Sequence, residues 1–321
     1  MLKEVPSLEF MTFTRIARLL WSGYDVQNSM TEYFLEGDQT LEKWSSIEES
    51  LKLKIGNCLV LPNKMKIALL SLVISIGGRI KYIIEHIYGK DYLPSNFMGL
   101  LKWTLLGIID AKRTAEAVIN DDNLPITKRY EIACTYCLED EIRMLWRELP
   151  ETNRDDYLNL RGPIYSLRYL PIYWTYYLRV ELNSLDGTLR EGYHMRTNCH
   201  CFGFLYACIT VNPPAAEYFI GNMNVQEKEK YFQCYFRIFV RRGEVDSSSA
   251  RNIYSCDIIY FLLSQLNENQ QRRIFEKYGY HILKSFLVFP YEIIFLEIES
   301  AVRRHLTADQ MESLKTIKRN E

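Results

Sequence analysis

Three segments of this sequence contain the same arrangement of apolar residues around a turn. When Leu149, Met223 and Leu266 are aligned, apolar residues stand seven, four and three positions upstream in every segment, and eight and nine positions downstream. These spacings place the upstream side chains on one face of a helix. The upstream residues are Ile142, Leu145 and Trp146, then Ala216, Phe219 and Ile220, then Ile259, Leu262 and Leu263. The pattern predicts a helix, a tight turn and a second helix in each segment.

The residues at the turn repeat in two of the three segments. Asn224 is followed by Glu227, and Asn267 by Gln270, at the spacing of a capping box. The first segment departs from this pattern, because it has Pro150 at the turn. The segments lie 74 and 43 residues apart, which indicates a degenerate array with an insertion. Stacked hairpins of this kind would form an irregular α-solenoid. The alternative is an irregular helical globule that contains similar hairpins.

The composition of the whole chain also favours helices. Its 321 residues include only 15 Gly and 10 Pro, and no segment shows a sustained alternation of apolar and polar residues. We therefore predict an all-α fold of stacked antiparallel helical hairpins, with an N-terminal helical cap region over 1–95 and a repeat region over 96–321 in one continuous domain. The expected helices are 7–22, 39–57, 63–88, 95–119, 126–148, 153–160, 171–184, 191–211, 214–223, 225–241, 247–265, 268–287, 290–304 and 307–318.

Neither membrane insertion nor secretion is indicated by the sequence. The apolar run from Ile67 to Gly78 is shorter than the roughly 20 residues that span a bilayer, so we expect a buried helix. The N-terminus lacks the features of a signal peptide, and the eight cysteines are expected to be reduced. These features predict an intracellular, cytoplasmic protein without membrane contact.

Residues 111–150, 215–232 and 261–275 resemble a loosely defined class of degenerate ankyrin- or HEAT-like helical repeat proteins. Such proteins are numerous in arthropod genomes, notably those of spiders, and occur in arthropod-associated bacteria. The resemblance covers roughly residues 100–290 and implies an all-helical interaction module, with a host-directed effector role if the chain comes from a symbiont or parasite. The ankyrin signature Thr-Pro-Leu-His is absent, so ordinary ankyrin repeats are not supported. The resemblance assigns no catalytic residue.

Cys134 and Cys137 form a Cys-x-x-Cys pair, which can be a redox couple, half of a zinc site, or two small core residues. The surrounding period predicts a single helix over 126–148 with both cysteines on one face. A thioredoxin-like pair would follow a strand, and no strand is predicted here. A zinc site would need two further ligands, such as Cys199 and Cys201. Core packing is the favoured interpretation, and a zinc-containing helical protein remains an alternative.

No catalytic motif stands out elsewhere. The run Glu139-Asp140-Glu141 is interpreted as a solvated face, because adjacent residues on a helix point in different directions. The five histidines form no metal-binding pattern, and no nucleophile elbow or phosphate loop occurs. We therefore expect a non-enzymatic protein without cofactor or metal.

The segment 161–179 contains the densest group of aromatic and arginine residues, and it lies in the insertion between the first and second hairpins. Tyr, Trp and Arg are enriched at binding hot spots, and insertions in solenoids often form the binding face. The opposite interpretation is a core helix, because aromatic residues also dominate core burial. The predicted partner-binding residues are Tyr165, Arg168, Tyr169, Tyr173, Trp174 and Arg179.

The expected partner is a protein. A net charge of −1 is unlike the basic excess of a dedicated nucleic-acid binder. A nucleic-acid-binding helical repeat that stacks bases on the tyrosines is the main alternative, because a local basic groove can exist in a neutral chain.

Overall fold

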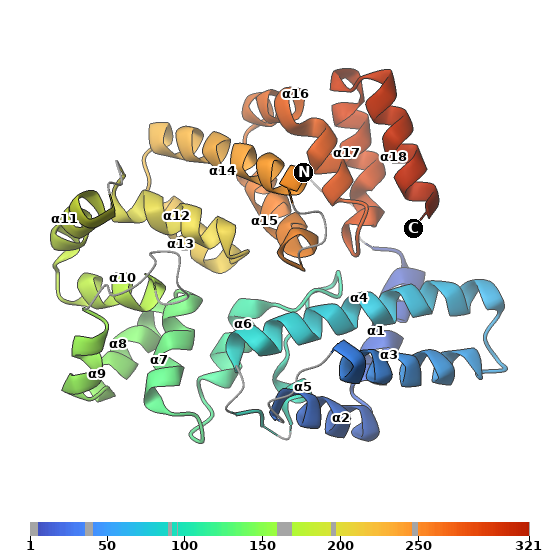
Figure 1. The fold of residues 1–321 in the computed structure, drawn as a ribbon, viewed down its shortest axis with the longest axis horizontal. Helices are drawn as coiled ribbons and strands as arrows, with labels where there is room; N and C mark the ends of the chain where they lie inside the picture. The colour runs from blue at the N-terminus through green and yellow to red at the C-terminus, as the bar shows by residue number, and fades with distance from the viewer. Residues whose placement is uncertain are drawn as a thin grey trace. The chain divides into compact units, whose positions relative to one another are not determined.

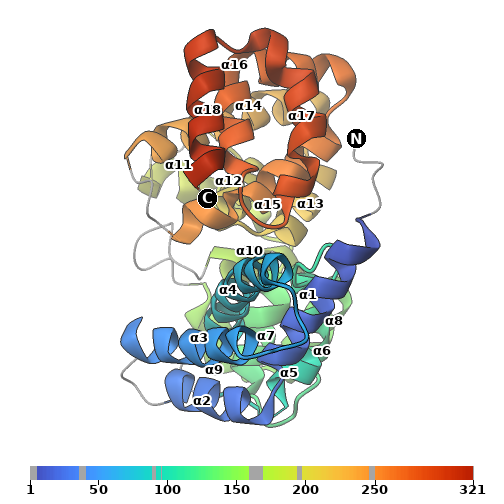
Figure 2. The same ribbon diagram turned by 90° about the vertical axis from the view of Figure 1, so that its right-hand side faces the viewer.

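The fold was analysed on a computed structural model that describes residues 6–35, 41–88, 92–94, 96–158, 169–193, 197–245 and 250–320. The described residues form α-helices joined by turns and short loops, and they contain no β-strand (Figures 1 and 2). A single antiparallel bridge joins Trp103 to Ile109. The predicted all-α fold class is confirmed.

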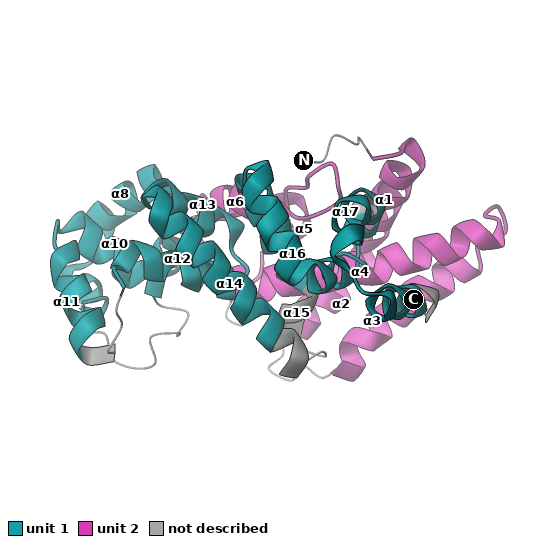
Figure 3. Ribbon diagram, turned by 90° about the horizontal axis from the view of Figure 1, so that it is seen from above, with its two compact units in different colours: residues 1–3, 125–321 teal, residues 4–124 magenta. Residues whose placement is uncertain are grey.

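The chain divides into two compact units between Leu124 and Pro125 (Figure 3). We call residues 4–124 the N-terminal unit and residues 125–321 the C-terminal unit. The predicted boundary at 95/96 falls inside the N-terminal unit. The segment beyond 95 belongs to the same compact unit as the helices that precede it, and the guanidinium of Arg18 lies 4.7 Å from the ring centroid of Trp103.

The N-terminal unit is arranged around its longest helix, α4. Its helices are α1 (Leu8–Trp21), α2 (Tyr24–Leu35), α3 (Leu41–Gly56), α4 (Asn63–Ile87), α5 (Phe97–Leu100) and α6 (Ala111–Val118). Helix α4 packs against α1 and α3. Trp21 lies directly over Gly77, where a Cβ would overlap the indole ring, and its Nε1 donates to the carbonyl oxygen of Val73 at 2.8 Å. Gly77 therefore permits the close approach of α1 and α4.

Helix α4 extends beyond the apolar run from Ile67 to Gly78 at both ends, as the predicted helix over 63–88 does. It spans 25 residues and is the one described helix long and apolar enough to cross a membrane. Half of its most apolar window is buried inside the protein, as in the core helix of a globular domain. The predicted helix over 63–88 is confirmed, and one face of it belongs to the core of the N-terminal unit.

The C-terminal unit contains the three segments that share the apolar pattern. Its helices are α7 (Ile126–Thr135), α8 (Glu139–Glu148), α9 (Glu151–Asp156), α10 (Tyr169–Leu178), α11 (Leu182–Tyr193), α12 (Cys199–Ile209), α13 (Pro213–Gly221), α14 (Val225–Val245), α15 (Ala250–Gln265), α16 (Glu268–Ser285), α17 (Phe295–Val302) and α18 (Ala308–Asn320). Two short 3₁₀ helices, Tyr291–Ile294 and Arg303–His305, flank α17.

The predicted hairpins correspond to α8–α9, α13–α14 and α15–α16. The apolar stripe is buried in all of them, with the exception of the half-buried Trp146. Both predicted capping boxes are present. Asn224 and Glu227 exchange hydrogen bonds between side chain and backbone at 2.9 and 3.0 Å, and Asn267 and Gln270 do so at 3.0 and 3.1 Å. The helix-turn-helix prediction is confirmed at these three places.

The single helix predicted over 126–148 is wrong, because a turn at Cys137 separates α7 from α8. Cys137 has a positive φ of 53°, and the N–H of Leu138 donates to the carbonyl oxygen of Ala133 at 3.0 Å. This is the Schellman arrangement that commonly ends helices. The two cysteines therefore do not share one face of a continuous helix, and Cys137 lies in the turn.

The same turn recurs twice. Val180 between α10 and α11 and Val211 between α12 and α13 also have positive φ values, of 60° and 53°. The matching backbone bonds, from Glu181 to Tyr176 and from Asn212 to Ala207, measure 2.9 and 2.8 Å. Cys137 and Val211 are 74 residues apart, the same separation as Leu149 and Met223. The turns at Cys137 and Val211 thus precede the first two hairpins by the same number of residues.

Other predicted helices need smaller corrections. The helix over 95–119 is interrupted by a turn with Gly107 at a φ of 74°, and the helix over 191–211 is two helices, because Asn198 caps the start of α12. Helix α2 was not expected at all.

Candidate partner-binding surface

The predicted partner-binding residues do not form one exposed surface. Tyr165 and Arg168 lie outside the described residues. Tyr169, Tyr173 and Trp174 are on α10 and have relative exposures of 1%, 0% and 0%. A wholly buried side chain cannot contact a partner, so these three residues are withdrawn from the predicted surface. Of the six, Arg179 is the one that the structure describes as exposed.

Helix α10 is buried because it contacts both α7 and α12. On the α7 side, the hydroxyls of Tyr130 and Thr175 are 3.2 Å apart. On the α12 side, Tyr169 donates from its hydroxyl to the carbonyl oxygen of Cys199 at 2.9 Å. Helix α10 is apolar around most of its circumference, as expected for a helix that is enclosed by neighbours.

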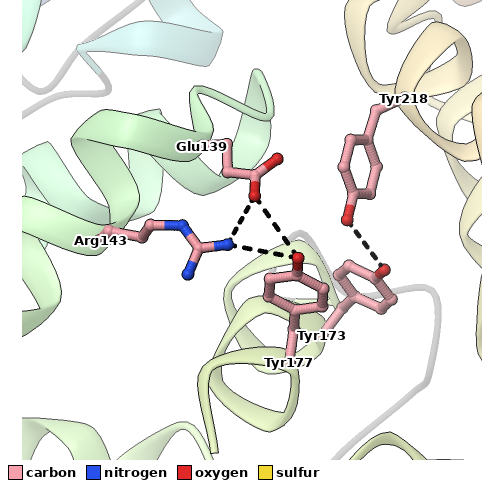
Figure 4. A network of polar contacts seen from close by, with 5 residues as sticks. All are labelled: Glu139, Arg143, Tyr173, Tyr177 and Tyr218. Atoms are coloured by element: carbon pink, nitrogen blue, oxygen red, sulfur yellow. Dashed lines mark hydrogen bonds and ion pairs between the residues drawn. The ribbon is translucent and has the colours of Figure 1, made fainter. Parts of the chain in front are cut away.

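The buried Tyr173 anchors a partly buried polar network between three helices. Its hydroxyl oxygen lies 3.2 Å from Nδ1 of His200 on α12 and 3.2 Å from the hydroxyl oxygen of Tyr218 on α13 (Figure 4). Burial raises the pKa of both tyrosines and lowers the pKa of His200. The network therefore consists of neutral groups at neutral pH, and it orients the helices without a buried charge.

A second network reaches the surface one turn further along α10. Arg143 on α8 donates from Nη2 to Oε1 of Glu139 at 2.6 Å and to the hydroxyl of Tyr177 at 3.3 Å. Tyr177 donates to the same carboxylate oxygen at 3.4 Å (Figure 4). The side chains of Glu139 and Arg143 are 42% and 45% exposed, so both are accessible from solvent.

The turn that ends α10 adds three exposed residues beside Tyr177. Arg179 donates from Nε to Oε1 of Glu181 at 3.2 Å, and both side chains are about two-fifths exposed. Val180, between them, is 92% exposed. The N–H of Val180 donates to the carbonyl oxygen of Tyr177 at 3.0 Å, which fixes this turn to the last residues of α10. We call Glu139, Arg143, Tyr177, Arg179, Val180 and Glu181 the α8–α10 surface.

Val180 is unusual because it is a β-branched residue in the left-handed region that has no buried contacts of its own. Left-handed backbone costs an L-residue roughly 1–2 kcal/mol. At the equivalent turns, Cys137 is buried and Val211 is half-buried, so packing offsets part of this cost. The exposed side chain of Val180 has no such compensation within the described residues. Strained residues of this kind occur often at binding sites.

Glu139 was interpreted as part of a solvated face, and neither Tyr177 nor Arg143 is among the predicted partner-binding residues. One feature of the sequence could have indicated the pairing of Glu139 and Arg143. They are four residues apart, which places them on the same face of a helix, where they can form an ion pair. The contact between α8 and α10 joins residues 38 positions apart in sequence. No local pattern reports a contact of this kind.

Six of the eight cysteines are buried, and Cys58 and Cys234 are half-buried. Burial raises the pKa of the Cys134 thiol well above its ordinary value, and it raises the pKa of Cys201 to about 12. Thiols of this kind are poor nucleophiles at neutral pH. Within the part of the chain that the structure describes, no group of three or more His, Cys, Asp or Glu side chains is placed to hold a metal ion.

Comparison with protein-family models, with curated proteins and with solved structures finds no match for this chain. The resemblance to ankyrin- or HEAT-like repeat proteins stays a prediction.

Proposed function

We propose that this chain is a non-enzymatic interaction protein that binds a protein partner through the α8–α10 surface of a helical repeat array. The observation on which the proposal rests is that α10 takes part in a half-exposed Arg–Glu–Tyr network and ends in a turn with an almost fully exposed valine. Tyr and Arg are enriched at binding hot spots, and an exposed apolar side chain supplies area to bury.

The array itself is part of the proposal. Helices α7, α10, α12, α14 and α16 each contact the next in this order, and each is connected to a neighbouring helix by a short turn or loop. We infer that these hairpins stack as an irregular α-solenoid within the C-terminal unit. In such an array each hairpin contacts only its neighbours, and the exposed edges form an extended surface for a partner.

A protein partner fits this surface better than a nucleic acid. Both arginines of the α8–α10 surface are already paired with carboxylates, Arg143 with Glu139 and Arg179 with Glu181. Binding to nucleic acid depends on cations that neutralise phosphates, and the two carboxylates would oppose this. An intracellular location, which the sequence features predict, agrees with this proposal. So does the host-directed role that the resemblance implies if the chain comes from a symbiont or parasite.

The test is affinity capture from a nuclease-treated native lysate, followed by mass spectrometry. The Arg143→Glu/Arg179→Glu variant reverses both cations of the α8–α10 surface. The matched control is Arg303→Glu/Lys315→Glu, which reverses two exposed, ion-paired cations elsewhere in the C-terminal unit. We expect one protein to be captured by the wild type and the control and to be lost with the surface variant. Recovery of nucleic acid without nuclease treatment, or equal capture by all three chains, would contradict the proposal.

A further inference from the structure

The hairpin of α3 and α4 ends in a tip that exposes its apolar side chains. Helix α3 ends at Gly56 and α4 begins at Asn63 (Figure 1). In the connection between them, Leu59 and Val60 are 97% and 89% exposed. Leu53 on α3 and Ile67 on α4 flank them, with exposures of 63% and 69%. We call residues 53–67 the α3–α4 tip.

Hydrogen bonds fix the backbone on both sides of these exposed residues. The N–H of Asn57 donates to the carbonyl oxygen of Leu53 at 3.0 Å, and that of Cys58 donates to Ile55 at 3.1 Å. Across the tip, Nζ of Lys66 donates to the carbonyl oxygen of Gly56 at 2.7 Å. The tip is therefore a defined structure, and nothing in it covers Leu59 or Val60.

The segment that forms the tip contains lysines and no acidic residue of its own. No acidic residue occurs from Leu51 to Ile84, and Lys52, Lys54, Lys64 and Lys66 all lie on or next to the tip. Lys52 pairs with Glu49 on the same helix, and Lys54, within the tip, pairs with Asp25 on α2. Lys66 donates to the carbonyl oxygen of Gly56, whereas the side chain of Lys64 is exposed near the apolar residues. Exposed aliphatic side chains together with lysines are typical of segments that enter the interface of an anionic membrane.

A protein partner agrees less well with these residues. Residues 51–67 contain no aromatic residue and no arginine, the types that dominate protein–protein hot spots. Spanning the membrane does not fit either, because the buried face of α4 packs on α1 and α3. Contact at the tip alone leaves this core intact.

We propose that the α3–α4 tip docks on the surface of an anionic phospholipid bilayer. Leu59 and Val60 enter the headgroup region, and the lysines face the lipid phosphates. This departs from the expectation of no membrane contact that the sequence suggested. It is independent of the protein binding proposed above, because the α8–α10 surface belongs to the other unit.

The experiment is cosedimentation of the full chain with vesicles of phosphatidylcholine, with and without phosphatidylserine. The Leu59→Asp/Val60→Asp variant changes the two most exposed residues of the tip, and Lys64→Glu tests the charge. The matched control is Leu296→Asp/Val225→Asp, an exposed leucine and valine of the C-terminal unit. Far-UV circular dichroism of each variant verifies that the helices are retained.

We expect the wild type and the control to bind vesicles that contain phosphatidylserine, and this binding to weaken with added salt. Both tip variants should bind at least about tenfold more weakly, since each removes an apolar or electrostatic contribution to interfacial binding. Equal binding to neutral vesicles, or unchanged binding of Leu59→Asp/Val60→Asp, would overturn the proposal. So would self-association that these substitutions abolish in the absence of vesicle binding, which would identify a second copy of the chain as the occupant.

Discussion

Replacing Trp174 with alanine tests whether α10 is a core helix. Trp174 is fully buried, and its ring centroid lies 4.8 Å from that of Tyr218 and 5.1 Å from that of Tyr177. Removing a large buried aromatic side chain costs about 3–5 kcal/mol of unfolding free energy, because contacts are lost and a cavity remains. We expect Trp174→Ala to lie in this range.

Replacing Trp174 with phenylalanine separates the contribution of the buried aromatic ring from that of the indole N–H. Nε1 of Trp174 has no hydrogen-bond partner among the described residues, although it is buried. A buried unsatisfied donor costs roughly 1–3 kcal/mol, and Trp174→Phe removes it while it keeps an aromatic ring. The phenylalanine variant should therefore be more stable than the alanine variant by at least about 2 kcal/mol.

The assay is urea unfolding followed by far-UV circular dichroism, with Arg179→Ala as the control at the exposed end of the same helix. Because the chain has two compact units, the shift is measured on the transition that Trp174→Ala moves. Arg179→Ala should change the free energy by no more than about 0.5 kcal/mol, as is usual for surface positions. If Trp174→Ala costs no more than Arg179→Ala, the burial of α10 described above is wrong.

Three further predictions concern the packing, the caps and the pH response of the C-terminal unit. Gly203→Ala should destabilise the fold by about 1–3 kcal/mol, because a Cβ there would overlap the buried ring of Phe219. At Gly187 a Cβ would meet no other atom, so Gly187→Ala should stabilise α11 by about 0.5–1 kcal/mol. Thermal unfolding of the two variants measures these opposite changes in stability. Asn267→Ala removes a capping box and should cost about 1 kcal/mol in chemical unfolding, whereas no change would show that the cap is unimportant. Burial lowers the pKa of His200 below 6.5 in the folded chain, so the unfolded chain binds more protons as the pH falls below this value. The stability that neutral His200 contributes is therefore present above this pH and lost below it. The wild type should lose more stability than His200→Gln upon acidification, and parallel losses in a pH series of unfolding curves would contradict the assignment.

The sequence was most informative where local chemistry determines the structure. The residues at Asn224 and Asn267 predicted both capping boxes, because a cap involves only neighbours along the chain. The repeated apolar stripe predicted three hairpins, because a helix with one buried face has a period of 3.6 residues.

The turns that were missed have an equally local cause. Schellman turns are usually recognised by glycine, and the two turns that were missed have Cys137 and Val180 at this position. The third turn, at Val211, falls at the predicted end of the helix over 191–211, just before Pro213. Because no glycine or proline marks the turn at Cys137, the apolar period of α7 continues into α8, and the sequence pattern predicts a single helix. The residue type at these turns departs from the usual preference, so the boundary could not be predicted from it.

The candidate surface could not be predicted, because the same residue types serve in cores and in interfaces. Tyr173 and Tyr177 are one helical turn apart, yet the first is completely buried and the second reaches a surface network. Which of them faces solvent depends on α8, α12 and α13, which pack around α10 from distant parts of the sequence. The hydrophobic periodicity of α10 alone does not reveal which of its faces these distant helices cover.

The most direct test of the proposed protein-binding surface is hydrogen–deuterium exchange of the full chain, with and without the protein recovered by affinity capture. The account predicts that partner binding slows exchange in peptides that cover the start of α8 and the turn after α10, around Arg143 and Val180. The same partner should leave exchange unchanged in the Arg143→Glu/Arg179→Glu variant. Protection of other segments of the wild type, with none at these two, would show that the partner binds elsewhere and would contradict the account.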